Sequence, residues 1–234
     1  VDTRDVVVSE GGATGVTVAL VEGAERSFIT YRGENAKFSM RDVSPNRLDA
    51  DLIHLPSFFL MEKLRPKYSE LIGLVRKKTG GIISFDTGWN PFGWRREVRS
   101  LKNVLRQVDI FLPNLDEAKG ILARGKHRKE GILVRRLLDF GLKVVAMKMG
   151  DRGVLISDRC KSISIPAFKV KTVDTTGAGD VFNAALAVAY LKGRDIAEAG
   201  KFASAAAALS TTGAGWSKYP TLKQVNDFLK QRGF

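Results

Sequence analysis

Between residues 52 and 165 the sequence alternates short apolar runs with longer segments in which apolar residues recur every three or four positions. Short apolar runs are typical of buried strands, and the longer periodic segments are typical of amphipathic helices. Parallel strands need long crossover connections, so this alternation predicts a mostly parallel sheet covered by helices on both faces. Strands are expected at 52–55, 82–85, 110–112 and 144–149, and helices at 68–78, 98–108 and 132–140.

The two ends of the chain have other patterns. The N-terminal region is β-branched and partly alternating, which predicts strands at 6–8, 15–21 and 27–31. Further along, 153–157 and 163–165 predict antiparallel additions to the sheet, and 180–192, 196–209 and 221–231 predict helices. We expect a single domain over residues 1–234, with an α/β core at 13–234 and a β-rich appendage at 1–12.

The composition argues against several classes of protein. With 234 residues, 44% of them hydrophobic, the chain can bury one sizeable α/β core. No run approaches the roughly 18 apolar residues of a membrane span, so we expect no membrane association. The single cysteine, Cys160, excludes an internal disulfide and suits a reducing, cytoplasmic location. His54 and His127 are the only histidines, which leaves little material for a His-based metal site or a catalytic triad.

The formal net charge of +13 allows two interpretations. One is a nucleic-acid-binding surface, and the other is a solvated basic surface that attracts small anionic substrates. The basic residues are spread along the chain and are not interleaved with aromatic residues as in a binding module. We therefore do not expect a nucleic-acid partner.

The strongest chemical signal is the glycine-rich run 174–180, Asp-Thr-Thr-Gly-Ala-Gly-Asp, which leads directly into an apolar helix. Gly177 and Gly179 let backbone amides approach an anion without an intervening Cβ, and a helix N-terminus attracts phosphate. Asp180 at this position has two interpretations. It could accept a proton from a hydroxyl that attacks a phosphate, or it could cap the helix. The spacing alone does not choose between them.

This run resembles the C-terminal signature D-T-x-G-A-G-D of the ribokinase-like (phosphofructokinase-B type) carbohydrate kinases. The resemblance implies that Asp180 is the catalytic base and that the amides of Gly177, Ala178 and Gly179 form an anion hole. It also implies a three-layer αβα fold with a central, mostly parallel sheet and a partial β-strand lid. The activity it implies is transfer of the γ-phosphoryl group of ATP to a hydroxyl of a small carbohydrate.

Other segments carry the same resemblance. Residues 14–16 and 33–36 are similar to the family's "TG" strand and "GAN" segment, with Glu34 a departure. Residues 113–118 resemble its N-x-x-E motif, which implies that Asn114 and Glu117 help to hold Mg²⁺ and its waters near the phosphates. Hard oxygen ligands after a strand suit Mg²⁺ held mostly through water. The same residues also suit the start of a helix, and both interpretations can hold together.

Two further segments resemble nucleotide-binding elements of the family. Lys148, Gly150 and Gly153 match a glycine turn that lies beside the nucleotide, although such a turn is also an ordinary hairpin connection. Ser204 and Gly213 lie in a stretch that resembles the helix and loop over the adenine. The alternative for that stretch is a small-residue helix used for close packing.

A monovalent-cation site is also implied. Asp174 and Thr176 resemble positions that give oxygen ligands to K⁺ in some family members. The loop 210–215 would complete the shell.

The residues that would contact the sugar are harder to identify from the sequence. The family normally begins with a further segment of βαβ scale that supplies a lid strand and part of the sugar pocket, and the resemblance here starts after it. Residues 1–12 would be a remnant of the lid, through which we expect a homodimer. Ser57, Asp86 and Asn90 follow predicted strands and are the candidate sugar contacts beside Asp180.

Three functions are compatible with these residues. The leading one is a Mg²⁺-dependent ATP:sugar kinase. A nucleoside or vitamin kinase of the same fold would use the same base and anion hole, and a non-catalytic ligand-binding or regulatory protein would lack turnover. The run from Gly120 to His127 is one residue short of a P-loop, but His127 stands where Ser or Thr would bind Mg²⁺ and the first glycine follows no strand. We therefore assign it no phosphate site.

Overall fold

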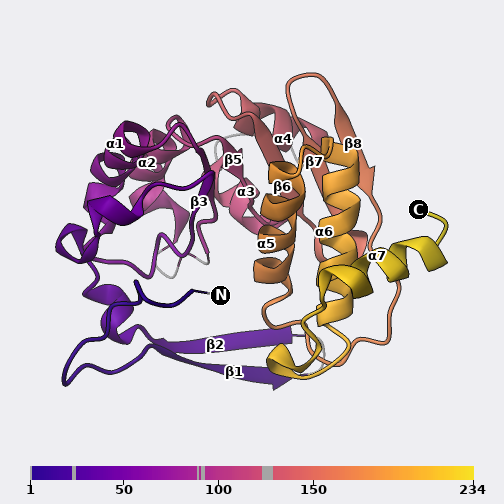
Figure 1. Ribbon diagram of the computed structural model, residues 1–234, viewed down its shortest axis with the longest axis horizontal. Coiled ribbons are helices and arrows are strands. Elements are labelled where there is room, and N and C mark those ends of the chain that lie inside the picture. The colour runs from indigo at the N-terminus through magenta and orange to yellow at the C-terminus, as the bar shows by residue number, and fades with distance from the viewer. Residues whose placement is uncertain (1, 23–24, 89, 91–92, 123–128) are drawn as a thin grey trace.

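The computed structural model describes residues 2–22, 25–88, 90, 93–122 and 129–234, with a six-stranded sheet at its centre (Figure 1). In spatial order the strands are β3 (Leu52–Leu55), β4 (Ile82–Phe85), β5 (Ile110–Phe111), β6 (Val144–Lys148), β7 (Val154–Ser157) and β8 (Ser162–Ile165). The first four run parallel, and β7 and β8 are antiparallel additions at one edge. The predicted fold class, a mostly parallel sheet with antiparallel additions, is confirmed.

Helices cover both faces of the sheet and make it the middle of three layers. One layer holds α1 (Tyr68–Lys78), α2 (Trp94–Leu105), α3 (Leu115–Ile121) and α4 (Glu130–Leu138), and the other holds α5 (Ala178–Leu191), α6 (Ile196–Ser210) and α7 (Leu222–Gln231). Short 3-10 turns occur at Gly33–Ala36, Met40–Asp42, Pro45–Arg47, Arg65–Lys67, Gly150–Arg152 and Gly215–Lys218.

Three helices begin and end earlier than the sequence predicts. The helix expected at 98–108 is found at 94–105, the one expected at 132–140 is found at 130–138, and the one expected at 180–192 is found at 178–191. The first ends early because the chain after it must reach the sheet: the Asp109 amide already donates to the carbonyl of Ile83 in the neighbouring strand.

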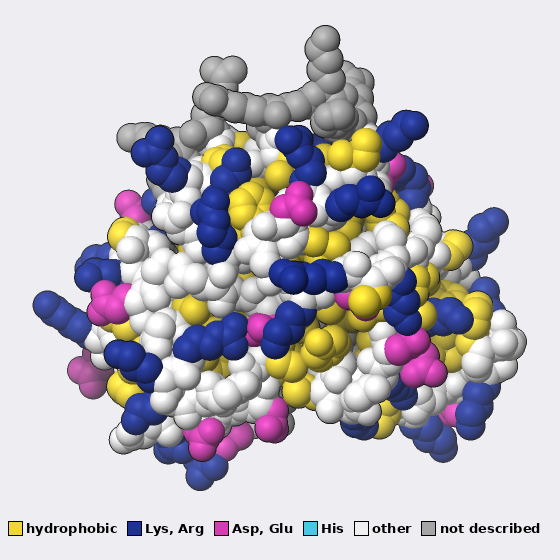
Figure 2. All heavy atoms as spheres, turned by 90° about the horizontal axis from the view of Figure 1, so that it is seen from above, with side chains coloured by type: hydrophobic (Ala, Val, Ile, Leu, Met, Phe, Trp, Pro, Cys, Tyr) yellow, Lys and Arg dark blue, Asp and Glu magenta, His cyan; other side chains and the backbone are white. Residues whose placement is uncertain are grey.

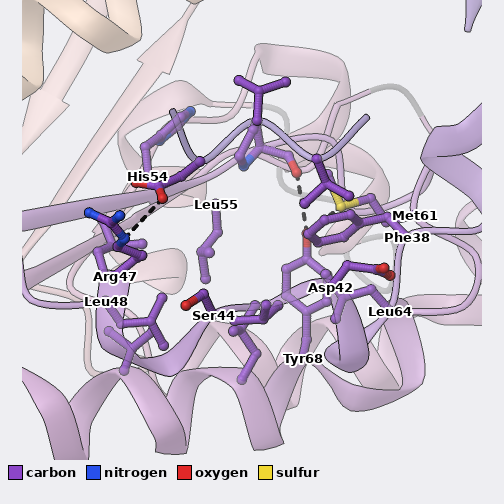
Figure 3. A pocket seen from close by; sticks show the side chains of 18 of the residues that line it. Phe38, Asp42, Ser44, Arg47, Leu48, His54, Leu55, Met61, Leu64 and Tyr68 are labelled. Atoms are coloured by element: carbon purple, nitrogen blue, oxygen red, sulfur yellow. Dashed lines mark hydrogen bonds and ion pairs between the residues drawn. The ribbon is translucent and has the colours of Figure 1, made fainter. Parts of the chain in front are cut away.

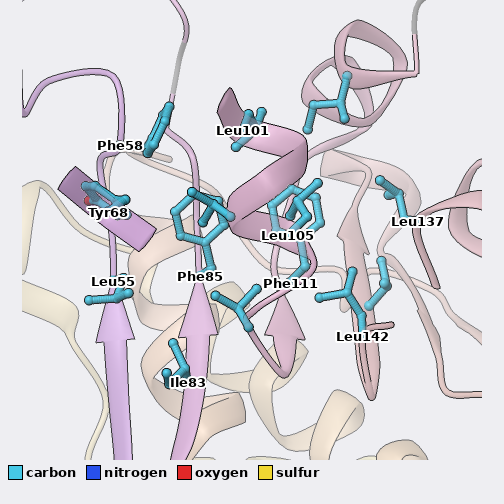
Figure 4. Packing of buried hydrophobic residues seen from close by; sticks show 14 of the residues in the cluster. Leu55, Phe58, Tyr68, Ile83, Phe85, Leu101, Leu105, Phe111, Leu137 and Leu142 are labelled. Atoms are coloured by element: carbon cyan, nitrogen blue, oxygen red, sulfur yellow. The ribbon is translucent and has the colours of Figure 1, made fainter. Parts of the chain in front are cut away.

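Neighbouring residues of the central strands point to opposite helical layers. Phe111 belongs to the cluster beneath α1–α4, whereas Ile110 and Leu112 belong to the cluster beneath α5–α7. This follows from the alternation of side chains along a strand. Figure 4 shows Phe85 and Phe111 filling the space between the strands and the helices of the first layer. Because both faces of the sheet are buried at its centre, β5 and most of β6 have continuous apolar sequences, whereas the edge strand β8 alternates serine with isoleucine.

A separate hairpin extends beneath the helical layers, apart from the main sheet (Figure 1). It pairs β1 (Val16–Glu22) with β2 (Glu25–Tyr31) in antiparallel fashion. The strand predicted at 6–8 is wrong, since residues 2–12 form turns and irregular chain. A β-branched run becomes a strand only when it has a partner to pair with, and here β1 and β2 pair with each other. The extra β element therefore lies within the range that the sequence assigned to the α/β core.

The surface is basic in many places. Figure 2 shows Lys and Arg side chains scattered over the face seen from above, between apolar and neutral groups. Within the described ranges, no helix combines the length and the apolar character that crossing a bilayer requires.

Candidate active site

The glycine-rich run 174–180 forms a turn that opens directly into α5. Gly177 is the N-cap of the helix and has a φ of +78°, a left-handed conformation that favours glycine. A Cβ at this position would also collide with the hydroxyl of Tyr219. The helix begins at Ala178, so Asp180 lies inside its first turn. Of the two interpretations of Asp180, the helix cap is therefore wrong.

This turn is anchored to the end of α6. The backbone amides of Val173 and Asp174 donate to the carbonyl of Thr211 over 2.7 and 3.1 Å. The Asp174 carboxylate accepts from the amide of Thr176 at 2.9 Å and from the amide of Gly215 at 3.2 Å. The carboxylate thus ties the turn to the loop after α6. The structure brings together the two segments to which the resemblance assigned a K⁺ site.

A largely buried ion pair lies beside the first turn of α5. Lys148, the last residue of β6, places its Nζ 2.8 Å from Asp86 Oδ2 and 3.1 Å from Asn183 Oδ1. The Asn183 side-chain amide donates to the same Asp86 oxygen over 2.6 Å. The ammonium is also close to the glycine turn, because a Cβ on Gly179 would lie 3.8 Å from Lys148 Nζ. These groups meet at the carboxyl ends of the parallel strands, where ligands of open α/β sheets bind.

The charged groups of this region, together with burial, shift one another's pKa values. Burial raises the pKa of Asp180, although its side chain still reaches solvent, and the charge of Asp86 raises it further. Burial also opposes ionisation of Asp86, but the charge and hydrogen bond of Lys148 hold its pKa below the ordinary value. The pKa of His54, whose Nδ1 lies 2.8 Å from Ser84 Oγ, is lowered mainly by burial. Asp86 is therefore the stably ionised carboxylate, and Asp180 is the one more ready to take a proton.

Asn114 and Glu117 form a capping box at the start of α3. The Glu117 amide donates to Asn114 Oδ1 over 2.8 Å, and the Asn114 backbone and side-chain amides donate to the Glu117 carboxylate over 2.8 and 2.9 Å. Burial and then the charge of Asp86 raise the pKa of Glu117 to about 7. The predicted helix cap is confirmed. Each carboxylate oxygen has two lone pairs, so the cap still leaves acceptors for the waters of a bound Mg²⁺.

Comparison with known proteins decides the family to which this geometry belongs. Residues 1–222 match the pfkB family of carbohydrate kinases. The chain is a pfkB family member.

Several relatives support this assignment. An uncharacterized sugar kinase of Archaeoglobus fulgidus is 30% identical over 208 residues, which are 88% of this chain and 80% of that protein. The structure of a ribokinase from Thermotoga maritima is 30% identical with a TM-score of 0.73, covering 94% of this chain and 70% of that one. A putative ribokinase II from E. coli, in complex with ATP and Mg²⁺, is 26% identical with a TM-score of 0.77, covering 92% and 71%.

The other residues that the resemblance placed on the nucleotide side of this pfkB chain have well-defined positions. Gly150 and Gly153, with φ of +62° and +88°, form the turn between β6 and β7, as a hairpin connection would. Ser204 is buried within α6, and Gly213 lies just after the end of that helix. Neighbours of Ser204 such as Ala203 pack in the core, so this stretch also serves close packing. A role in nucleotide binding stays a prediction for these residues.

The candidate sugar contacts differ in their surroundings. Asp86 accepts from the amide of Gly88 at 2.8 Å in addition to Lys148 and Asn183. Ser57 follows β3 with a φ of 57°, an uncommon backbone for a residue with a side chain. Asn90 is buried, and its side-chain amide donates to the carbonyl of Gly93 over 3.1 Å. Direct contact with sugar stays a prediction for all three residues.

A hollow of about 480 Å³ opens beside β3 (Figure 3). His54 and Leu55 line it from the strand, Tyr68 from α1, and Phe38 and Leu48 from the preceding segment. Most of its wall is apolar. Sugar hydroxyls need polar partners, so this hollow by itself does not suit a sugar.

The sequence analysis did not single out Asn183 or Tyr219 as site residues. It also did not place His54, which bonds Ser84, in this region. Asn183 could have been found, because residues three apart on a helix share a face, and Asn183 follows Asp180 by three. Tyr219 reaches Gly177 only through the fold, and no local signal predicts it. The P-loop-like run from Gly120 to His127 lies largely outside the described residues.

Proposed function

We propose that this chain is a Mg²⁺-dependent kinase that transfers the γ-phosphoryl group of ATP to a hydroxyl of a small sugar, with Asp180 as the base. One observation carries the proposal: Asp180 follows the amides of Gly177, Ala178 and Gly179 in the first turn of α5, beside the Lys148 ammonium. The E. coli neighbour, whose complex contains ATP and Mg²⁺, supports the choice of nucleotide and cation.

The reaction would use these groups as follows. The sugar hydroxyl oxygen bonds to the γ-phosphorus while the bond from that phosphorus to the β–γ bridging oxygen breaks, and ADP leaves with the electron pair. The hydroxyl proton passes to the Asp180 carboxylate. The backbone amides of 177–179 stabilise negative charge on the transferred group. Mg²⁺, when held through water by Asn114 and Glu117, would neutralise charge on the phosphates.

Asp180→Asn tests the assignment of the base. The variant keeps size and hydrogen-bonding capacity but loses the proton acceptor, so kcat should fall at least about a hundredfold. Affinity for ATP, measured by calorimetry, should stay within a few-fold of the parent. Asp195→Asn is the matched control, because Asp195 caps the neighbouring helix α6 and Asn caps equally well. Near-normal kcat in Asp180→Asn would contradict the proposal.

The proposed substrate is a furanose- or ketose-like sugar or sugar acid rather than a sugar phosphate. A panel of sugars, nucleosides and sugar phosphates assayed for ADP release decides this point. A clear preference for a nucleoside would favour a nucleoside kinase. Absence of turnover with every hydroxyl substrate, together with ligand binding, would favour a non-catalytic regulatory role.

The proposal includes a K⁺ ion between the turn 174–177 and the loop after α6. Its support is the Asp174 carboxylate, which already joins these two segments. Replacing K⁺ by a large organic cation should lower activity, and unchanged activity would remove K⁺ from the proposal.

A homodimer through the hairpin is also proposed. The register of β1 and β2 puts Val16, Val18, Leu20, Ile29 and Tyr31 on one face, and all five are exposed. An isolated two-stranded hairpin with such a face needs a cover, and the same apolar face of a second copy supplies one. Sedimentation should show a dimer for the parent and a monomer for Ile29→Lys, whereas a monomeric parent would contradict this arrangement.

A further inference from the structure

The Lys148 ammonium occupies a position that is unfavourable for a positive charge. Its Nζ lies beside Gly179, at the N-terminal end of α5, where the helix dipole repels positive charge. Its side chain is only 18% exposed, so the ammonium is also largely removed from water. Both effects oppose a charged lysine here unless a carboxylate compensates.

Asp86 supplies that compensation and Asn183 completes the arrangement. The Asp86 side chain is 13% exposed, with its Oδ2 2.8 Å from Lys148 Nζ, and Asn183 bonds both partners. Asn183 is itself buried on α5, three residues after Asp180. The ammonium is thus fixed both to the end of β4 and to the helix that carries Asp180.

This geometry leaves the ammonium able to bind an anion. A lysine ammonium has three N–H donors, and within the described residues Asp86 and Asn183 accept two of them. The third can donate to a phosphoryl oxygen seated on the amides of 177–179. A charge-assisted bond of this kind stabilises most strongly where charge gathers during transfer.

We propose that Asp86 and Asn183 are positioning residues that hold the Lys148 ammonium at the anion hole, where it meets the transferred phosphoryl group. This inference rests on the proposed kinase function. It gives Asp86 a task on the phosphate side of the site, in place of the sugar contact that the sequence predicts.

Calorimetry with ATP and with ADP tests the role of Lys148 without turnover. Lys148→Met should weaken ATP binding about tenfold or more while ADP binding changes little, because the ammonium meets the γ-phosphoryl group. Equal weakening of both nucleotides, or no change in either, would overturn the assignment. Asp180→Asn, which tests the base, should leave ATP binding nearly intact, so the two ideas fail separately.

Steady-state kinetics then separate positioning from sugar contact. If Asp86 acts through Lys148, Asp86→Asn should lower kcat about tenfold or more, with KM for the sugar within about twofold. A sugar contact would instead raise that KM with little change in kcat, and this result would overturn the proposal. In the Lys148→Met background, Asp86→Asn should add less than about a twofold loss, because its target is gone. An equal loss in both backgrounds would also count against positioning.

Asp109→Asn is the matched control for the loss of a buried ion pair. Asp109 is 8% exposed and pairs with Arg76 at 2.6 Å and Lys143 at 3.0 Å. It lies just before β5, at the amino ends of the parallel strands, whereas Asp86 follows the carboxyl end of β4. This variant should lower the melting temperature yet leave kcat within about twofold of the parent, since it is far from the reacting groups. A kcat loss equal to that of Asp86→Asn would show that general destabilisation explains both.

Discussion

The two helical layers are built from different side chains. Beneath α1–α4 the core is aromatic, with Phe58, Phe59, Tyr68 and Phe85 packed edge to face at centroid distances of 4.9 to 6.1 Å. Beneath α5–α7 the core is mainly aliphatic, and α6 contributes a run of small buried residues: Ala199, Gly200, Ala203, Ala205 and Ala206. Small side chains let helices approach closely, so α5 and α6 pack tightly on each other and on the sheet. The layer that carries the candidate active site is therefore the more closely packed of the two.

The layers also differ in charge. Residues 63–140, which contain α1–α4, hold 18 of the 38 Lys and Arg residues but only 8 of the 25 Asp and Glu residues. Most of the surplus positive charge therefore belongs to the layer that does not carry the glycine turn. Net charge is a poor guide to the anion site proposed for this chain, because that site would consist of backbone amides and one lysine.

Removing one ring from the aromatic layer should have the largest effect on stability. Phe111 is fully buried and stacks on Phe85 at a centroid distance of 5.9 Å. Phe111→Ala should cost about 3–5 kcal/mol of unfolding free energy, measured by denaturant titration, because the surrounding rings cannot collapse into the cavity. A cost under about 1 kcal/mol would mean that this core is far more plastic than its packing implies.

Each layer also contains a carboxyl group whose pKa is raised by burial, Glu117 in one and Asp180 in the other, and Glu117 of α3 gives the clearer pH signature. Its pKa in the folded protein is raised to about 7, so its favourable contribution is complete below its ordinary pKa near 4.5 and is lost as pH rises through 7. Relative to Glu117→Gln, the parent should lose on the order of 3 kcal/mol of stability between about pH 4.5 and pH 8 in metal-free buffer. Identical pH dependence in parent and variant would contradict the burial argument.

A glycine-to-leucine substitution made in each layer compares how closely the two layers are packed. A Cβ on Gly200 of α6 would come within 2.5 Å of Ile165 Cδ1, whereas one on Gly131 of α4 would meet nothing within 4 Å. Gly200→Leu should cost about 1–3 kcal/mol through overpacking. Gly131→Leu should be neutral or stabilising by up to about 1 kcal/mol, because it replaces glycine in a helix. Thermal melts compare the two, and equal effects would remove the distinction between the layers.

Most of the fold could be predicted from sequence because its elements are buried on defined faces. The strands at 52–55 and 82–85 and the helix at 68–78 have the predicted bounds, since continuous apolar runs and three-to-four periodicity are strong local signals. The strand predicted at 6–8 failed because β-branched composition favours a strand, but pairing with a neighbouring strand decides whether one forms. Helix ends shifted where the approach to the next strand, as at Asp109, overrode the local pattern.

The candidate site was predictable only in part. The glycine turn with Asp180 is contiguous in sequence, so its resemblance to a family motif is visible in the residues alone. Asp86 and Lys148 lie 62 positions apart, and only the parallel order of β4, β5 and β6 brings their side chains together. Single-sequence reasoning could name both residues but could not pair them.

Strand β5 has a consequence for how the molecule unfolds. Phe111 is part of one core while Ile110 and Leu112 are part of the other, so three consecutive residues hold both helical layers to the same backbone segment. Neither layer can lose its packing on this strand without exposing the other. We therefore expect amide hydrogens in α1–α4 and in α5–α7 to exchange through the same global opening, as one cooperative unit.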